Sequence, residues 1–209
     1  MQASKAYFRF EKVALRSLNL LSLELILAQR GLADTGTTLE IADLSRAAIV
    51  LAVAAMDAYF TGIFAELFVP YLKKKGCNKH TCEILTKAGL NVQTAVELLT
   101  MERPLRRVRR LIDNYLDNRV TQKMHAIDSL FLAYTITNFS DRIQKLNNRR
   151  NLLRSVELLV TRRHMIVHDG DMNAHGRLRP IKPREITKRI KDLQLYVRGA
   201  DELLRKQLG

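Results

Sequence analysis

Two arginines and two histidines lie close together near the C-terminal end of a predicted helix: Arg162, Arg163, His164 and His168. The planar guanidinium group of arginine binds phosphate oxygens through several N–H donors. The imidazole of histidine gains or loses a proton near neutral pH, which few other side chains do. These residue types at this spacing indicate chemistry at a phosphodiester.

RNA is the phosphodiester that suits these residues, because it carries its own nucleophile, the ribose 2′-hydroxyl. His168 would act as a general acid or base, a contribution of roughly 10²–10⁴-fold. Arg163 would stabilise the charge that builds on the phosphoryl oxygens. His164 lies four residues before His168, on the same helix face, and would assist. This chemistry needs no metal or cofactor, and a two-fold dimer would bring two copies of the motif into one cleft.

The apolar pattern predicts that these side chains end a long helix over residues 141–168, capped by Ser140-Asp141. Apolar residues recur along it every seven positions: Leu146, Leu153, Val160 and Val167. Arg163 falls on the companion position of this seam, seven residues after Val156, whereas Arg162 does not. Arg163 and His168 are about 140° apart on a regular helix. They are expected to converge because Asp169-Gly170 ends the helix there.

A second charged residue interrupts a strongly apolar helix in the first half of the chain. Residues 39–68 are predicted to be helical, and Asp57 follows a stretch that is apolar on nearly every face. Charged groups are rarely buried without a partner. Asp57 is therefore expected to pair with Arg163, either as a structural ion pair between two core helices or to orient the arginine. Because this stretch contains Asp57 and Glu66, it is interpreted as a core helix and not as a membrane span.

The remaining elements are also expected to be helices, so the chain is predicted to be one all-α domain, a helical bundle over residues 1–209. The further helices are expected over residues 3–30, 80–88, 92–102, 104–116, 121–137 and 183–206. Gly31 is expected to end the first helix, and Val69-Pro70 the second, because the helical state is disfavoured before proline. Loops are expected over residues 34–38, 73–76 and 171–182.

Charge is concentrated in the second half of the chain, which suggests a polyanionic partner. The formal net charge is +14, and residues 101–209 contain 24 of the 35 Lys+Arg against 12 of the 21 Asp+Glu. The alternative is a basic surface that only aids solubility. The arginines expected to contact an RNA backbone are Arg106, Arg107, Arg109, Arg110, Arg162, Arg177 and Arg179.

With two cysteines and no signal peptide recognised, a reducing cytoplasm is the expected compartment.

The stretch Arg163–His168 resembles the R-x4-6-H signature of the HEPN superfamily and is similar to RiboL-PSP-HEPN-like proteins. The residue after the arginine, often asparagine in that family, is His164 here. The stretch Ala54–Phe60, with Asp57, resembles the acid-bearing inner helix of many HEPN proteins. The resemblance implies a helical bundle, a homodimer and metal-independent endoribonuclease activity that leaves a cyclic phosphate. It also implies a role as a toxin or in phage defence, with a possible antitoxin partner.

Two other classes of function remain open from the residues. In the first, a non-catalytic basic helical protein binds nucleic acid or a partner antitoxin. In the second, a metal-dependent phosphohydrolase uses some of five possible ligands near the motif, since two histidines four residues apart are a common ligand pair. These ligands are His164, His168, Asp169, Asp171 and His175. Cys77, His80 and Cys82 also lie close together but lack an evident fourth ligand, so ordinary buried or loop residues are expected there.

Overall fold

The computed structural model describes residues 3–30, 41–117, 119 and 121–208, and this part of the chain is all-α. The helices are α1 (Lys5–Gln29), α2 (Asp43–Lys75), α3 (Lys79–Lys87), α4 (Val92–Thr100), α5 (Pro104–Asp117), α6 (Met124–Phe131), the short 3-10 helix η2 (Leu132–Tyr134), α7 (Phe139–Leu146), α8 (Leu152–Asp169) and α9 (Pro183–Leu208). The predicted fold class is confirmed. The expected stop at Gly31 and the loop over residues 34–38 lie outside the described residues.

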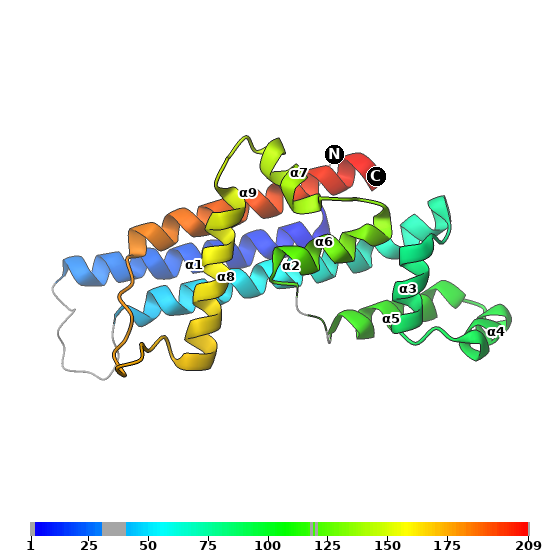
Figure 1. Ribbon diagram of the computed structural model, residues 1–209, viewed down its shortest axis with the longest axis horizontal. Coiled ribbons are helices and arrows are strands. Elements are labelled where there is room, and N and C mark those ends of the chain that lie inside the picture. The colour runs from blue at the N-terminus through cyan, green and yellow to red at the C-terminus, as the bar shows by residue number, and fades with distance from the viewer. Residues whose placement is uncertain (1–2, 31–40, 118, 120, 209) are drawn as a thin grey trace.

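Three long helices, α1, α2 and α9, run side by side, and α8 crosses them (Figure 1). The buried positions of α1 are spaced three to four residues apart, as in Phe10, Ala14, Ser17 and Leu21, because only one of its faces meets the core. On α9 the buried row includes Ile186, Ile190 and Leu193. The two outer helices therefore each bury one apolar stripe against α2.

α2 is the central helix because it is apolar on several faces at once. It contacts α1, α5, α8 and α9, and Phe60, Phe64 and Phe68 lie fully inside the core. Burying an aromatic side chain of this size contributes roughly 1.5–3 kcal/mol. α2 is long and apolar enough to cross a membrane, but 56% of its most apolar 18-residue window is buried within the bundle. The structure thus uses α2 as a core helix.

The predicted stop of this helix at Val69-Pro70 is wrong, because α2 continues through Pro70 to Lys75. Proline removes one backbone hydrogen bond and clashes with the preceding turn. Here Pro70 is exposed, so water can solvate the carbonyl that loses its partner, and Phe68 and Tyr71 on either side are buried. Packing on both sides of Pro70 outweighs the local cost. The loop expected over residues 73–76 is also helical up to Gly76.

The predicted helix over residues 141–168 is two helices. α7 ends at Leu146, Asn148 adopts the left-handed conformation at φ 46°, and α8 begins at Leu152. Asparagine enters this conformation more readily than most residues, and three asparagines stand at this break: Asn147, Asn148 and Asn151. The heptad pattern extended across the break because apolar spacing does not record a turn.

The seam of α8 also differs from the predicted one. Leu152, Val156 and Leu159 are its buried residues, whereas Leu146 is 44% and Val167 48% exposed. Arg163 lies seven residues after Val156, on the same face of α8. No residue of α8 after Leu159 is buried, so the helix leaves the core before Arg163. The predicted helix over residues 121–137 is likewise shorter, consisting of α6 and η2.

Candidate functional site

The arginine–histidine motif forms the last two turns of α8, as its sequence predicts. Gly170 ends the helix in the left-handed conformation, with φ 60°. The N–H of Asp171 then donates to the carbonyl of Met165, so the chain reverses directly after the motif. This local stop leaves His168 in the final turn of α8 and exposed.

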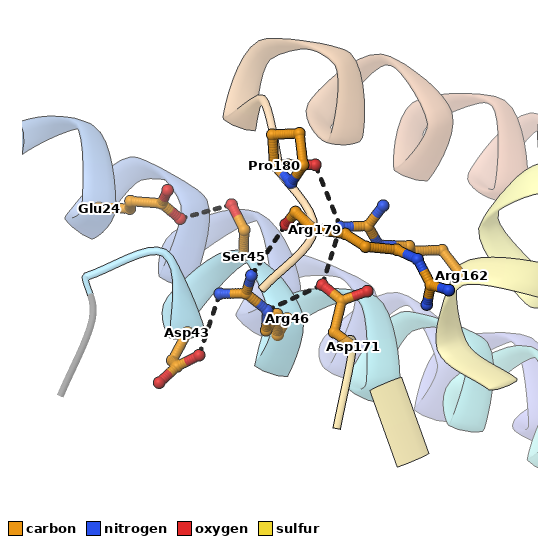
Figure 2. Close-up of polar contacts among 8 residues, drawn as sticks. All are labelled: Glu24, Asp43, Ser45, Arg46, Arg162, Asp171, Arg179 and Pro180. Atoms are coloured by element: carbon orange, nitrogen blue, oxygen red, sulfur yellow. Dashed lines mark hydrogen bonds and ion pairs between the residues drawn. The ribbon is translucent and has the colours of Figure 1, made fainter. Parts of the chain in front are cut away.

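Arg162 belongs to a buried polar network and not to an open RNA-binding surface. Its Nη2 donates to Oδ2 of Asp171 over 2.8 Å and to the carbonyls of Arg179 and Pro180 (Figure 2). Arg46 of α2 donates to the same Asp171 oxygen over 2.9 Å. Because Asp171 is fully buried and Arg162 only 17% exposed, this network ties the loop after α8 to α2. The predicted RNA contact through Arg162 is therefore corrected to a structural role.

Arg163 is the arginine that remains available. Its side chain makes no hydrogen bond or ion pair with any residue that the structure describes, and its Nε is buried without an acceptor. A buried donor without a partner costs free energy. Such a group is suited to an anion that arrives from outside the chain. The network that surrounds Arg162 leaves Arg163 as the phosphate-binding candidate.

Arg163 opens onto a pocket of about 980 Å³ between α8 and the start of α6. The residues that line it are Gln122, Lys123, Met124, His125, Ala126, Asp128, Glu157, Val160, Thr161, Arg163, His164 and His168. The rings of His164 and His168 lie 4.3 Å apart between centroids. The structure therefore brings Arg163, His164 and His168 together, as the motif predicts.

Asp57 does not pair with Arg163, so that expectation is corrected. Oδ1 of Asp57 accepts hydrogen bonds from the backbone N–H of Thr121, over 2.7 Å, and from its hydroxyl. Oδ2 accepts from the side-chain amide of Gln122 over 3.0 Å. Gln122 lines the pocket directly before α6. Asp57 thus holds the wall of the pocket opposite α8 through Thr121 and Gln122, and it does not contact Arg163.

Sequence reasoning missed the contribution of α6 altogether. Three of the five histidines of the chain line this pocket, and the third, His125, lies in the first turn of α6. No side chain caps this helix at Lys123, so its first N–H groups are additional donors for an anion. The adjacent Lys123 and His125 were a weak signal. Only the packing of the chain shows that they face the motif.

The other predicted RNA-contacting arginines are not gathered around the pocket. Arg106, Arg109 and Arg110 are exposed on α5, which lies apart from α8 in Figure 1, and Arg107 is partly buried. Their helix packs on α2 through Val108 and its neighbours. In the loop before α9, Arg177 is exposed, whereas Arg179 is partly buried and its carbonyl accepts a hydrogen bond from Arg162. These residues form separate basic patches.

The residues considered for a metal site are not gathered into one cluster within the described residues. The carboxylate of Asp171 faces Arg46 and Arg162 and cannot join His164 and His168. Within the described ranges, no group of three or more His, Cys, Asp and Glu side chains is arranged to hold a metal ion. Cys77 and Cys82 are joined as a disulfide, which corrects the expectation of unpaired loop residues.

The pocket contains the groups that phosphodiester transfer requires. The guanidinium group of Arg163 and the ammonium group of Lys123 would attract a phosphate. The imidazoles would transfer protons near neutral pH. Two carboxylates also line the pocket, and that of Asp128 accepts hydrogen bonds from the backbone N–H and the hydroxyl of Ser140.

A comparison with family models matches residues 15–206 to RiboL-PSP-HEPN. Neither the curated proteins nor the solved structures give a significant match. The matched region includes α2, both walls of the pocket and the whole arginine–histidine motif. Together with the all-α bundle, this match shows that the chain belongs to the RiboL-PSP-HEPN family.

Proposed function

We propose that this protein is a metal-independent endoribonuclease. The observation that carries the proposal is the position of Arg163, which has no partner among the described residues and shares a pocket with the His164–His168 pair. Arg163 would bind the scissile phosphate and stabilise the charge that forms on it. His168 would transfer a proton, and His164 would assist it.

The proposed reaction is attack of the ribose 2′-oxygen on the adjacent phosphorus. A base removes the 2′-hydroxyl proton, the bond from phosphorus to the 5′-oxygen breaks, and an acid protonates that oxygen. The products are a 2′,3′-cyclic phosphate and a free 5′-hydroxyl. RNA therefore supplies both the nucleophile and the leaving group.

Four further parts of the proposal do not rest on the geometry of one chain. We propose a homodimer in which two copies of the motif meet in one cleft. We propose a role as a toxin or in phage defence in the cytoplasm, with an antitoxin as partner. Light scattering at high protein concentration tests the dimer, and a purely monomeric protein would contradict it.

The central test is cleavage of labelled RNA, structured and unstructured, in the presence of EDTA. We expect cleavage that persists in EDTA and is lost in Arg163→Ala and in His168→Ala. His80→Ala is the matched control, because His80 lies on α3 outside the pocket with its side chain 45% exposed, and it should keep wild-type activity. The 3′ ends should resist phosphatase until acid opens the cyclic phosphate.

Two outcomes would replace the proposal by another function. Cleavage that EDTA abolishes and a divalent cation restores would indicate a metal-dependent phosphohydrolase. RNA binding without cleavage, unchanged by the His168 substitution, would indicate a non-catalytic nucleic-acid-binding protein.

A further inference from the structure

His125 is a histidine of the pocket that lies outside the arginine–histidine motif. It is the second residue of α6 and is exposed. Along the chain, the rest of α6, η2, α7 and most of α8 separate it from His164. The pocket nevertheless has His125 on its α6 wall and His164 and His168 on its α8 wall. One protomer therefore presents imidazoles from two sides of a single space.

Cleavage of RNA by its own 2′-hydroxyl needs two proton transfers at different atoms. One group takes the proton from the 2′-oxygen, and another gives a proton to the departing 5′-oxygen, on the far side of the phosphorus. The attacking and leaving oxygens stand roughly in line. Two neighbouring histidines on one helix face would approach the phosphate from the same side, whereas histidines on two walls would approach it from two sides.

We propose that His125 is the second acid–base residue of this pocket and acts with His168 of the same protomer. The proposal rests on the endoribonuclease activity proposed above and assigns a further proton-transfer group to it. One of the two histidines removes the 2′-hydroxyl proton, and the other protonates the 5′-oxygen as the bond from phosphorus to that oxygen breaks. Arg163 would bind the phosphoryl oxygens while the two histidines transfer the protons. In the proposed dimer the partner's copy of the motif lies in the same cleft, and the mixing experiment below tests which protomer's His168 acts with His125.

The structure provides a reason for the position of His125. Asp57 of the central helix accepts hydrogen bonds from Thr121 and from Gln122, directly before α6. These bonds anchor the first turn of α6 to the core, and α8 is anchored to the same helix through Arg46 and Asp171. Both walls of the pocket are thus held against α2.

The charged and titratable groups that face His125 come from both walls. From the α6 wall they are Lys123 and Asp128, and from α8 they are Glu157, Arg163, His164 and His168. Asp128 is engaged by Ser140. A pH profile of cleavage must therefore be compared with variants of this set, and His164→Gln is the most informative comparison because His164 contacts His168.

The first experiment measures kcat/KM against pH for the wild type, His125→Gln and His168→Gln. We expect a bell-shaped profile for the wild type and a loss of about 10²–10⁴-fold in each variant. Each variant should lose one limb, and the two lost limbs should be opposite. His80→Gln should keep both limbs and the wild-type rate. Thermal unfolding should be the same for all four proteins, because His125 and His168 are exposed and the side chain of His80 is 45% exposed.

RNA with a bridging sulfur at the 5′ position separates the acid from the base. A thiolate leaves without protonation, so the variant that lacks the general acid should recover to within about tenfold of the wild type on this substrate. The variant that lacks the base should not recover. Rescue of one variant, and only one, supports the pair. Rescue of neither, or a His125→Gln profile that keeps both limbs, overturns the role of His125.

Mixing the two inactive variants tests whether one protomer supplies both histidines. If both act in the same pocket, refolded mixtures of His125→Gln and His168→Gln remain inactive. If His125 acts with His168 of the other protomer, mixed dimers contain one intact site, and about a quarter of the activity returns. Such a return would overturn the same-protomer assignment.

The failure of this inference can be distinguished from the failure of the proposed function. The wild type could cleave RNA in EDTA and need Arg163 and His168 but not His125. That result would support the proposed endoribonuclease and overturn only the role of His125. If the wild type does not cleave RNA at all, the proposed function fails first, and the inference fails with it.

Discussion

Nη2 of Arg162 donates a hydrogen bond to the fully buried Oδ2 of Asp171 over 2.8 Å, across the end of α8. The neighbouring Arg163 makes no such contact within the described residues and faces the pocket. Two adjacent arginines therefore have opposite tasks: one holds the fold, and the other is available to a substrate.

The two arginines should separate stability from activity. We expect Arg162→Ala to lower the free energy of unfolding by about 2 kcal/mol, because Asp171 loses one charged hydrogen-bond partner while keeping Arg46. Arg163→Ala should leave stability almost unchanged and lower RNA cleavage by about 10²–10³-fold. Denaturant unfolding and initial cleavage rates on the same preparations provide the comparison. Equal effects of both substitutions on stability would contradict the assignment.

Asp171 should be the more sensitive member of the network. Asp171→Asn keeps a side chain that tolerates the left-handed φ of 61°, so only the charge changes. Arg46 and Arg162 then lose their shared counter-charge in a buried site, which costs about 3–5 kcal/mol. Chemical denaturation measures this loss. Asp169→Asn, at an exposed neighbouring position, is the control and should cost little.

Asp57 is expected to act through the start of α6. In Asp57→Asn, the amide that replaces one oxygen cannot accept a hydrogen bond, so either Thr121 or Gln122 loses its acceptor. We expect a loss of about 1–3 kcal/mol in stability and a fall in kcat with little change in KM. Glu66→Gln on the same helix, outside the pocket, should change neither. A normal kcat in Asp57→Asn would show that the α6 wall does not need this anchor.

The exposed arginines of α5 test whether RNA extends beyond the pocket. Replacing Arg106, Arg109 and Arg110 by alanine should raise KM and leave kcat unchanged if they contact the RNA backbone. The slope of log affinity against log salt should then fall by about 0.7 for each lost phosphate contact on a single strand. Measurements of RNA binding at several salt concentrations decide this. An unchanged slope would indicate that the arginines of α5 do not contact RNA and only aid solubility.

Buried tyrosines predict a loss of stability at high pH. Burial raises the pKa of Tyr59, Tyr134 and Tyr196 above the usual value of 10.0. Folded protein therefore keeps protons that the unfolded chain releases above pH 10, so the free energy of unfolding falls as pH rises past that value. Each tyrosine contributes a slope of about 1.4 kcal/mol per pH unit. Denaturant unfolding between pH 8 and 11 measures the slope, and Tyr59→Phe should reduce it.

Local features of the chain were predictable where the sequence contains its own signals. Gly170 ends α8 and Pro183 begins α9, as expected, because both depend on the conformational range of single residues. The predicted helix end at Pro70 was wrong, because the burial of Phe68 and Tyr71 outweighs the tendency of proline to end a helix. The prediction of one long helix before Gly170 was wrong, because asparagines near Asn148 favour a turn and the spacing of apolar residues gives no sign of it.

The sequence by itself determined the fold class and the helix that bears the motif, and it singled out Arg163, His164 and His168 as candidates, because helical periodicity and the R-x4-H spacing are local properties. Only the tertiary structure decided that Arg162 pairs with Asp171, that Asp57 holds Thr121 and Gln122, and that His125 shares the pocket. These contacts join residues far apart in the chain, and the packing of α6 and α8 on α2 selects them. Their partners are set by three-dimensional proximity, which spacing along one helix does not encode.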